Sequence, residues 1–175
     1  MKVHRFIGEF DLSQPHILIK DSELAKQMRT VLKLRTGEQV ILSNGRGEEA
    51  LCELGGYGAD SVSLTILEQL TNQAEPSSYV VLYCAILKRE NFELVAQKAT
   101  EVGVQKIVPI ITRRTVKFNF RQDRLQKIIR EAAEQSGRGN VPMLSEPIEF
   151  ETILEQAMGN GLNVLFDPMG EPLNK

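Results

Sequence analysis

The chain has 175 residues, of which 42% are hydrophobic and 25% are charged, with a net charge of −2. This composition is typical of a globular protein and excludes extended disorder, and no apolar run approaches the ~20 residues needed to span a bilayer. The first residues lack the apolar core of a signal peptide, and Cys52 and Cys84 lie far apart in apolar segments. We therefore expect a cytoplasmic protein with buried, reduced thiols, no membrane segment and no metal site.

The first 70 residues have the pattern of short β-strands with one helix. The helix is expected from Ser22, a good N-cap, to about Leu34, before Gly37. The Asn44-Gly45 pair predicts a hairpin, and Gly55-Gly56-Tyr57-Gly58 predicts another turn. Strands are expected at residues 3–7, 16–19, 39–43, 50–54 and 61–67. A small β-barrel with one helix is the architecture that this pattern favours.

Residues 71–78 have the composition of a linker, and the pattern changes after them. Continuous apolar runs, typical of strands buried on both faces, alternate with segments of helical periodicity over residues 79–175. Strands are expected at 79–87, 106–112 and 162–166, and helices at 91–102, 121–136 and 149–158. The fold class is therefore α/β, with a parallel sheet in the second of two domains.

Basic residues are concentrated in the middle of the chain. Residues 88–138 hold twelve Lys or Arg against six Asp or Glu, inside a chain that is acidic as a whole. A local positive field of this kind is what a polyanion detects, but the outer faces of two solvated helices give the same count. A second basic stripe, formed by Lys26, Arg29 and Lys33 on the first helix, is also explained by a solvated face. Charge alone leaves both interpretations open.

Common catalytic motifs are absent. The chain has no Gly-x-Gly-x-x-Gly after a strand, no Walker loop, no nucleophile elbow and no His-Glu-x-x-His motif. Its only histidines, His4 and His16, lie in the first domain, which argues against histidine catalysis. Glu101, Glu131 and Glu134 are possible bases, although a carboxylate on a helix is usually a surface residue.

Three segments resemble a known family. They are residues 98–104 (Lys-Ala-Thr-Glu-Val-Gly-Val), residues 113–117 (Arg-Arg-Thr-Val-Lys) and residues 131–142, which contain Glu-Gln-Ser-Gly-Arg. Together with weaker matches near residues 5–7 and 31–38, they are similar to the RsmE family. The resemblance implies an S-adenosylmethionine-dependent methyltransferase acting on N3 of a uridine in 16S ribosomal RNA. It also implies a PUA-like β-barrel (1–70), a linker (71–78) and a SPOUT-type domain (79–175).

The resemblance has one departure. Family members continue past residue 175 with a Gly-Pro-Glu-Gly-Gly loop and a further segment that form a C-terminal trefoil knot and most of the cofactor pocket. We therefore expect a C-terminally truncated chain that lacks the knot and has an incomplete S-adenosylmethionine site. Because ligands of open α/β sheets bind beyond the carboxyl ends of the strands, Phe166, Asp167 and Pro168 are expected to form a partial wall. The family also implies that full-length members are homodimers.

The expected partner is small-subunit ribosomal RNA or the assembled small ribosomal subunit. Weak candidates for catalysis are Glu101, Gln135 and Arg138, with the last two lining the active-site mouth. The spacings Lys98/Glu101 and Glu134/Arg138 are equally explained by ion pairs within a helix. Two other functions stay open, a non-catalytic RNA-binding module and a dimeric α/β domain with no nucleic-acid role. The residues expected to bind RNA are Arg5, Arg29, Lys33, Arg35, Lys88, Arg89, Arg113, Arg114 and Arg138.

Overall fold

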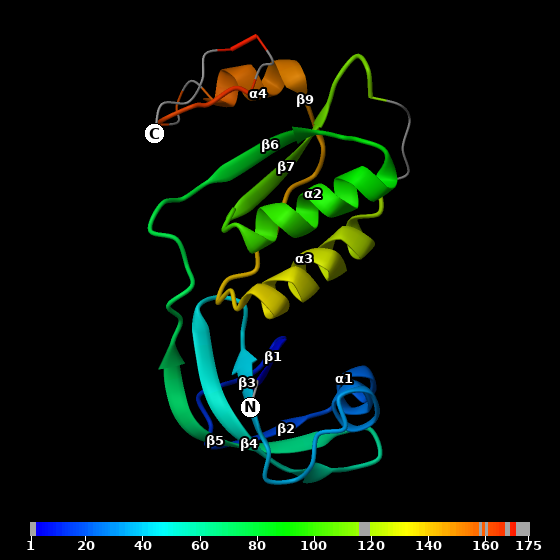
Figure 1. Cartoon of the computed structure of the whole chain (residues 1–175), viewed down its shortest axis with the longest axis vertical. Coiled ribbons are helices and arrows are strands. Elements are labelled where there is room, and N and C mark those ends of the chain that lie inside the picture. The colour runs from blue at the N-terminus through cyan, green and yellow to red at the C-terminus, as the bar shows by residue number, and fades with distance from the viewer. Residues whose placement is uncertain (1–2, 116–119, 158, 160, 167–168, 171–175) are drawn as a thin grey trace.

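The computed structural model describes residues 3–115, 120–157, 159, 161–166 and 169–170. The chain forms two units stacked along the long axis of the molecule (Figure 1). The N-terminal unit is a five-stranded sheet with α1, and the C-terminal unit is a parallel sheet with α2, α3 and α4. Helix α3 lies between α2 and the five-stranded sheet, so it forms much of the contact between the units (Figure 1).

The five-stranded sheet has the order β1-β3-β4-β5-β2, with β1 parallel to β3 and the other pairs antiparallel. The strands are β1 (His4–Ile7), β2 (His16–Ile19), β3 (Gln39–Ser43), β4 (Glu48–Tyr57) and β5 (Val62–Thr71). Alternate residues point inward, as β2 shows by burying Ile17 and Ile19 while Leu18 stays exposed. Cys52 is fully buried in this core, and burial raises the pKa of its thiol to about 11.

One local prediction for this unit is corrected, and another is confirmed. The run Gly55-Gly56-Tyr57 is not a turn but the end of β4, because a bulge after Leu54 absorbs the irregularity and the ladder with β5 continues to Tyr57. The reversal comes at Gly58, whose N–H donates to the Ser61 carbonyl at 2.9 Å. The Asn44-Gly45 prediction is confirmed, since β3 and β4 form a hairpin there, with Gly45 and Gly47 at positive φ.

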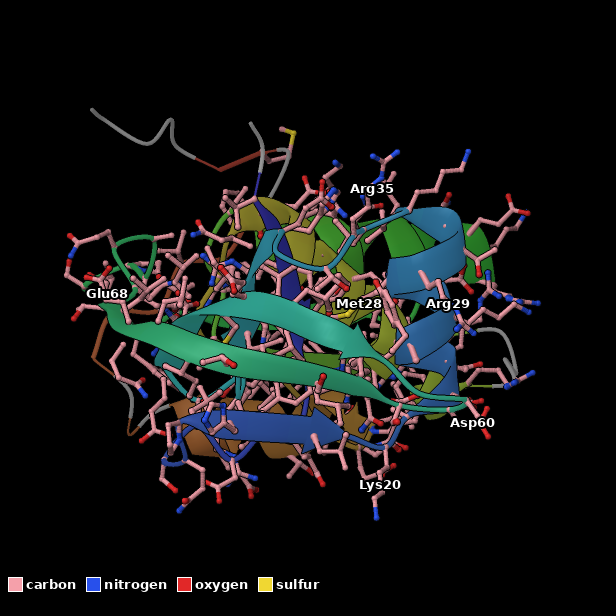
Figure 2. The ribbon with its side chains drawn as sticks, turned by 90° about the horizontal axis from the view of Figure 1, so that it is seen from below. Lys20, Met28, Arg29, Arg35, Asp60 and Glu68 are labelled. Atoms are coloured by element: carbon pink, nitrogen blue, oxygen red, sulfur yellow. The ribbon has the colours of Figure 1, made fainter. Side chains whose placement is uncertain are left out.

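The first helix is shorter and less regular than predicted. Helix α1 (Ser22–Lys26) is capped by Asp21, whose carboxylate accepts the Leu24 N–H at 3.0 Å. A wider π-helical turn, η1 (Gln27–Val31), replaces the rest of the expected helix. Met28, fully buried, points inward between this turn and the sheet (Figure 2). Periodicity cannot distinguish an α-turn from a π-turn, because both keep one apolar face inward.

The C-terminal unit is built on a fully parallel sheet. Strand β7 (Lys106–Ile111) is central, with β6 (Val81–Ala85) on one side and β8 (Met143–Leu144) and β9 (Ile148–Glu149) in succession on the other. Helices α2 (Arg89–Glu101) and α3 (Gln122–Ser136) pack on one face of the sheet, and α4 (Phe150–Ala157) follows β9. Strand β6 and Cys84 within it are half-buried along their length rather than buried on both faces.

One predicted strand in this unit is wrong. Residues 162–166 form an exposed, irregular segment that joins neither sheet. An apolar run becomes a strand only where a neighbouring strand offers its backbone groups, and this segment has no such neighbour among the described residues. Strands β8 and β9 were not predicted, because a strand of two residues is too short to show the alternation of apolar and polar residues. Across the described residues, none of the helices combines the length and hydrophobicity needed to cross a membrane.

Candidate nucleic-acid interface

The carboxyl ends of β6 and β7 bring together cations that are distant in the sequence. The two strands are parallel and in register from Val81 opposite Lys106 to Ala85 opposite Ile110, so both end at one edge of the sheet. Lys88 follows β6, and Arg113 and Arg114 follow β7; all three are exposed, and none forms an ion pair within the described residues. We call Lys88, Arg113 and Arg114 the edge cluster. It lies where open α/β sheets bind ligands.

The two arginines of the edge cluster are held by a tight turn. The Thr115 N–H donates to the Thr112 carbonyl at 2.9 Å, and the Thr112 N–H donates to Thr115 Oγ1 at 2.8 Å. These reciprocal bonds fix the backbone on both sides of Arg113 and Arg114. The turn therefore presents two adjacent guanidinium groups from a defined backbone, which lowers the entropy lost on binding an anion.

Other cations of the basic segment are neutralised inside the protein. Glu93 accepts from Arg89 at 3.0 Å and from Arg124 at 2.6 and 3.0 Å, and hydrogen bonds from Arg124 and then Arg89 lower the pKa of Glu93 to about 2. Lys98 pairs with Glu101 at 2.7 Å, which confirms the predicted ion pair within α2. The positive field that residues 88–138 present at the surface is therefore weaker than their count of Lys and Arg suggests.

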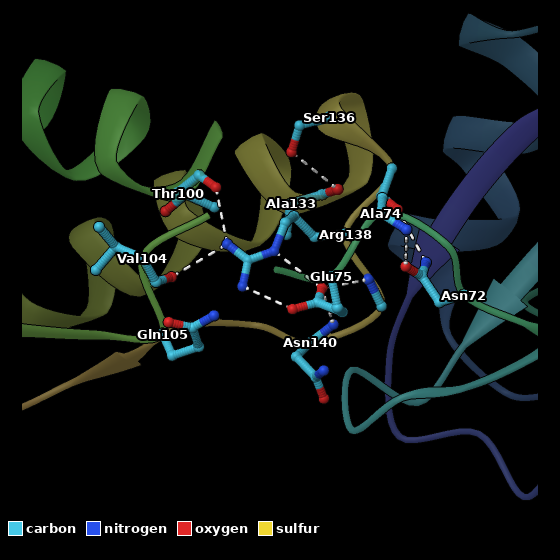
Figure 3. A network of polar contacts seen from close by, with 12 residues as sticks. Asn72, Ala74, Glu75, Thr100, Val104, Gln105, Ala133, Ser136, Arg138 and Asn140 are labelled. Carbon is cyan, nitrogen blue, oxygen red and sulfur yellow. Dashed lines mark hydrogen bonds and ion pairs between the residues drawn. The ribbon is translucent and has the colours of Figure 1, made fainter. Parts of the chain in front are cut away.

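Arg138 is a structural residue, which corrects its predicted role in RNA binding and at the active-site mouth. Its side chain is 2% exposed, and its Nε and Nη2 atoms each lie 2.9 Å from a carboxylate oxygen of Glu75 (Figure 3). Its Nη1 donates to the carbonyls of Thr100, at 2.9 Å, and Val104, at 3.1 Å. Four of its five N–H groups thus bind inside the protein, and burial keeps the side chain away from an external anion. The sequence offered no signal for this partner, because Glu75 lies in the linker.

Arg5 is also committed inside the protein. It forms an ion pair with Glu49, which is 2% exposed, and Glu49 accepts a hydrogen bond from Asn72 at 2.8 Å. Asn72 donates in addition to the Gly137 carbonyl at 2.9 Å, at the end of α3. Arg5 thus belongs to a polar chain that joins the two units, and its contact with RNA stays a prediction.

Glu134 does not pair with Arg138, although their spacing allowed it. Its Oε1 accepts the Ile7 N–H at 2.8 Å, on the outer edge of β1. Burial raises the pKa of Glu134, and the hydrogen bond from Ile7 opposes that rise only in part. Glu134 therefore caps an otherwise open strand edge and holds α3 against the N-terminal unit.

The other catalytic candidates lie away from the edge cluster. Helix α2 runs back from the carboxyl edge of the sheet, so Glu101 lies at the opposite edge, near the start of β7. Helix α3 also ends there, with Gln135 exposed on its last turn. Hydrogen bonds from Lys98 and Gln97 hold the pKa of Glu101 below its usual value, which makes it a weak base. Neither residue lies near the edge cluster.

The described residues do not form an enclosed cofactor site. Phe166 is 82% exposed in an irregular segment, and Asp167 and Pro168 lie outside the described residues. Within the described ranges, no three His, Cys, Asp or Glu side chains are grouped as metal ligands would be. Of the three residues expected to form a cofactor wall, the structure therefore describes only Phe166, and its side chain is exposed.

A large hollow separates α1 from α3, with a volume of about 1240 Å³. Its lining includes seven carboxylates against the four cations Lys20, Lys26, Lys127 and Arg130. This excess of acid does not suit a polyanion. Three further predicted RNA-binding residues, Arg29, Lys33 and Arg35, lie outside its lining and are exposed on the N-terminal unit.

Comparisons with known proteins give one consistent answer. An RNA methyltransferase domain family matches residues 73–175, and an RNA methyltransferase PUA domain family matches residues 26–67. Ribosomal RNA small subunit methyltransferase E of Bacillus subtilis is 31% identical over 132 residues, which are 72% of this chain and 52% of that protein. The protein of the same name from Rickettsia conorii is 32% identical over 74% of this chain and 52% of its own length. The chain therefore spans about half the length of these curated relatives.

Two solved structures are similar over most of the chain. One is ribosomal RNA small subunit methyltransferase E from Neisseria gonorrhoeae bound to S-adenosylmethionine, with a TM-score of 0.81 and 27% identity over 89% of this chain and 65% of that one. The other is a putative methyltransferase of Legionella pneumophila in complex with the same cofactor. Its TM-score is 0.84 and its identity 29%, over 97% of this chain and 72% of that one.

Proposed function

The chain belongs to the RsmE family of RNA methyltransferases, and on that premise we propose that it serves S-adenosylmethionine-dependent methylation of N3 of a uridine in 16S ribosomal RNA. The observation that carries the proposal is the edge cluster. Parallel strands deliver three cations, which form no ion pair with any described residue, to the edge where a ligand of this fold class binds. The relatives named as small-subunit methyltransferases and the cofactor-bound neighbours support it.

The domain organisation is part of the same proposal. We assign residues 1–70 to a PUA-like β-barrel, 71–78 to a linker and 79–175 to a SPOUT-type domain. The two separate sheets and the matched ranges 26–67 and 73–175 support this division. Homodimerisation, a cytoplasmic location and action on the assembled small subunit follow from the family in the same way. Sedimentation of the chain with and without small ribosomal subunits tests the first and the last.

The chemistry sets what the residues of this chain must do. S-adenosylmethionine supplies a methyl group on a positively charged sulfur. Transfer of that methyl group therefore needs no metal to activate the leaving sulfur. The protein must hold the RNA so that the acceptor nitrogen lies in line with that methyl group. The target base must also be unstacked, which phosphate contacts from the edge cluster help to offset. N3 must lose its proton when the methyl group is added. We assign no residue as the acceptor of that proton, since Glu101 and Gln135 lie at the other edge of the sheet.

RNA binding by the chain tests the role of the edge cluster. We expect the 175-residue chain to bind 16S ribosomal RNA in a filter assay, with an affinity that falls steeply between low and physiological salt. Replacing Lys88, Arg113 and Arg114 by Ala should lower the slope of log K against log salt by about 2 to 3. The matched control replaces Lys98, Arg121 and Arg124, three cations already paired with acids. Equal losses in both variants would contradict a specific role for the edge cluster.

We also propose that residues 1–175 alone hold S-adenosylmethionine weakly. The exposure of Phe166 and the irregular path of residues 162–166 support this, because a single exposed aromatic ring encloses no ligand. Calorimetric titration of the chain with S-adenosylmethionine measures it directly. Tight binding by the 175 residues would show that they contain a complete site.

A further inference from the structure

One edge of the five-stranded sheet has no strand partner among the described residues. Strand β2 is the last in the order β1-β3-β4-β5-β2, and Figure 2 shows it beside β5 at the rim of the sheet. The Ile66 N–H donates to the Pro15 carbonyl at 2.9 Å, which sets the phase of the antiparallel ladder. Ile17 and Ile19 therefore bond to β5, whereas the N–H and C=O of Leu18 point away from it. Leu18 thus presents one donor and one acceptor at an open edge.

The opposite edge of the same sheet, on β1, is covered. Helix α3 contacts β1, and the Glu134 carboxylate accepts the Ile7 N–H at 2.8 Å. Strand β2 has no bulge in its ladder with β5 and no Pro, Lys, Asp or Glu within its four residues, which are among the usual means of blocking an edge. Its Leu18 side chain is 60% exposed. The edge of β2 is therefore able to take a further strand.

Strand β2 runs along the hollow between α1 and α3. All four of its residues line this hollow, whose volume is about 1240 Å³. Pockets for small molecules usually measure ~300–1,000 Å³, so the hollow has room for a chain segment. Its walls include the exposed apolar side chains of Leu18 and Val31, and residues of α3 such as Gln126 and Lys127. A peptide that adds a strand to a sheet uses an open strand edge and a lined groove of this kind.

The charge of the hollow selects the kind of peptide. Its lining holds seven carboxylates and four cations, an excess of three negative charges. Glu9 follows β1, Glu23 lies on α1 and Glu131 on α3, so carboxylates line the hollow from three separate segments. All three are exposed, and none of them forms an ion pair with another described residue. The hollow therefore attracts Lys and Arg side chains and repels the phosphates of RNA.

We propose that the open edge of β2 and the hollow beside it, here called the β2 groove, bind an extended Lys- and Arg-rich segment of another protein. The segment adds a strand to β2 through backbone hydrogen bonds with Leu18, and its cations pair with the carboxylates that line the groove. Basic arms of this kind occur on proteins that bind nucleic acids. Such a protein partner is additional to the RNA of the proposed function, and its binding does not require that function.

The test is fluorescence anisotropy of a fluorescein-labelled peptide of about nine residues in which Lys and Val alternate, titrated with the 175-residue chain. We expect binding that weakens as salt rises, and no binding of the matched peptide of alternating Glu and Val. The groove variant combines Glu9→Gln, Glu23→Gln and Glu131→Gln, and should weaken binding about tenfold at low salt. The control variant, which should change the affinity by less than about twofold, replaces by Gln three exposed carboxylates outside the groove, Glu53, Glu68 and Glu90.

Leu18→Pro separates strand pairing from charge. It removes an N–H that points away from β5, so the ladder with β5 keeps its hydrogen bonds. It should weaken peptide binding at least about fivefold, and Leu18→Ala, which keeps the N–H, should weaken it less. Thermal unfolding by circular dichroism checks that each variant folds. A Lys–Val peptide N-methylated at alternate residues makes the same test on the wild-type chain, because it keeps every cation but loses the donors along one edge, and it should bind at least about fivefold more weakly.

Three outcomes would overturn the β2 groove. The first is equal affinity of the groove variant and the control variant for the Lys–Val peptide, and the second is an affinity that N-methylation leaves unchanged. The third is a Leu18→Pro variant that loses affinity for 16S ribosomal RNA and not for the peptide, since the hollow would then be an RNA surface. If the wild-type chain fails to bind the peptide at low salt while the edge-cluster variant loses affinity for RNA, the β2 groove is overturned and the proposed function stands.

Discussion

The guanidinium of Arg138 and the carboxylate of Glu75 form a bidentate ion pair, with both nitrogen–oxygen distances at 2.9 Å. Glu75 also accepts the N–H groups of Gly139 and Asn140, at 2.9 and 3.0 Å, so its carboxylate receives four hydrogen bonds (Figure 3). Because Arg138 binds carbonyls at the end of α2 as well, the pair ties the linker to the C-terminal ends of both α2 and α3. This ion pair stabilises the fold by connecting the linker to the two helices, and it is not part of a binding surface.

Removing the ion pair between Arg138 and Glu75 should destabilise the protein strongly. Arg138→Ala leaves the Glu75 carboxylate partly buried without its cation, and breaking a buried pair costs about 3–5 kcal/mol. Equilibrium unfolding in urea measures the change. Lys98→Ala, which breaks an exposed pair on α2, is the matched control and should leave the midpoint almost unchanged. A small loss for Arg138→Ala would show that the pair contributes little to folding.

The same pair should make the free energy of unfolding depend on pH in the acidic range. Burial by itself raises the pKa of Glu75, but hydrogen bonds from Arg138 and Asn140 outweigh it and hold the pKa below the ordinary value of 4.5. A carboxyl whose pKa is lowered in the folded state contributes stability that is present above pH 4.5 and is lost as the pH falls through the folded pKa. The difference in unfolding free energy between the wild type and Glu75→Gln should therefore shrink below pH 4.5. A constant difference down to the acid limit would contradict this.

Glu134 should have the opposite effect on the pH dependence of stability. Its pKa is raised by burial, so above pH 4.5 the folded state binds its proton more strongly than the unfolded state does, and stability falls as the pH rises through that window. Glu134→Gln keeps an oxygen that accepts the Ile7 N–H but removes the buried charge. We expect the variant to be more stable than the wild type at pH 7 and nearly equal to it below pH 4.5, as measured by thermal unfolding across pH. Lower stability at pH 7 would show that the charge strengthens the contact with β1.

Lys33→Gly should separate stability from binding. A lysine at φ 55° is strained, and Gly removes that strain at the cost of a more flexible unfolded chain, so a net gain of about 0.5–1 kcal/mol is expected. The variant should be more stable in urea and bind RNA more weakly, since it loses one of the cations that are expected to bind RNA. Lys26→Gly, on α1 with a helical backbone, is the control and should lower stability. A loss of stability in Lys33→Gly would mean that the side chain contributes more than its strain.

Local patterns predicted the regular elements well because the cause of each is local. Helix α3 lies within one residue of its expected range, since its apolar residues recur at helical spacing and Gly137 follows its end. Strands β2 and β3 occur at the expected residues because each is a short run of β-forming residues. The resemblance to the RsmE family, read from residues 98–104 and 131–142, is confirmed by the family matches.

Features that depend on distant partners were not predictable in this way. Sequence spacing suggested Glu134 for Arg138, but the folded chain supplies Glu75 and leaves Glu134 to the Ile7 N–H. Residues 162–166 have the composition of a buried strand, yet they form none, because a strand requires a neighbour as well as apolar side chains.

The sequence by itself determined the two-unit α/β organisation, the places of most helices and strands, and the family, since these follow from periodicity and from motifs of consecutive residues. Only the tertiary structure decided which cations remain available to a ligand. Parallel register placed Lys88 and the turn of Arg113 and Arg114 at the same end of the sheet. Folding paired Arg5 with Glu49 and buried Arg138 against Glu75. The physical reason is that an ion pair is chosen by distance in space and by burial, neither of which a residue count contains.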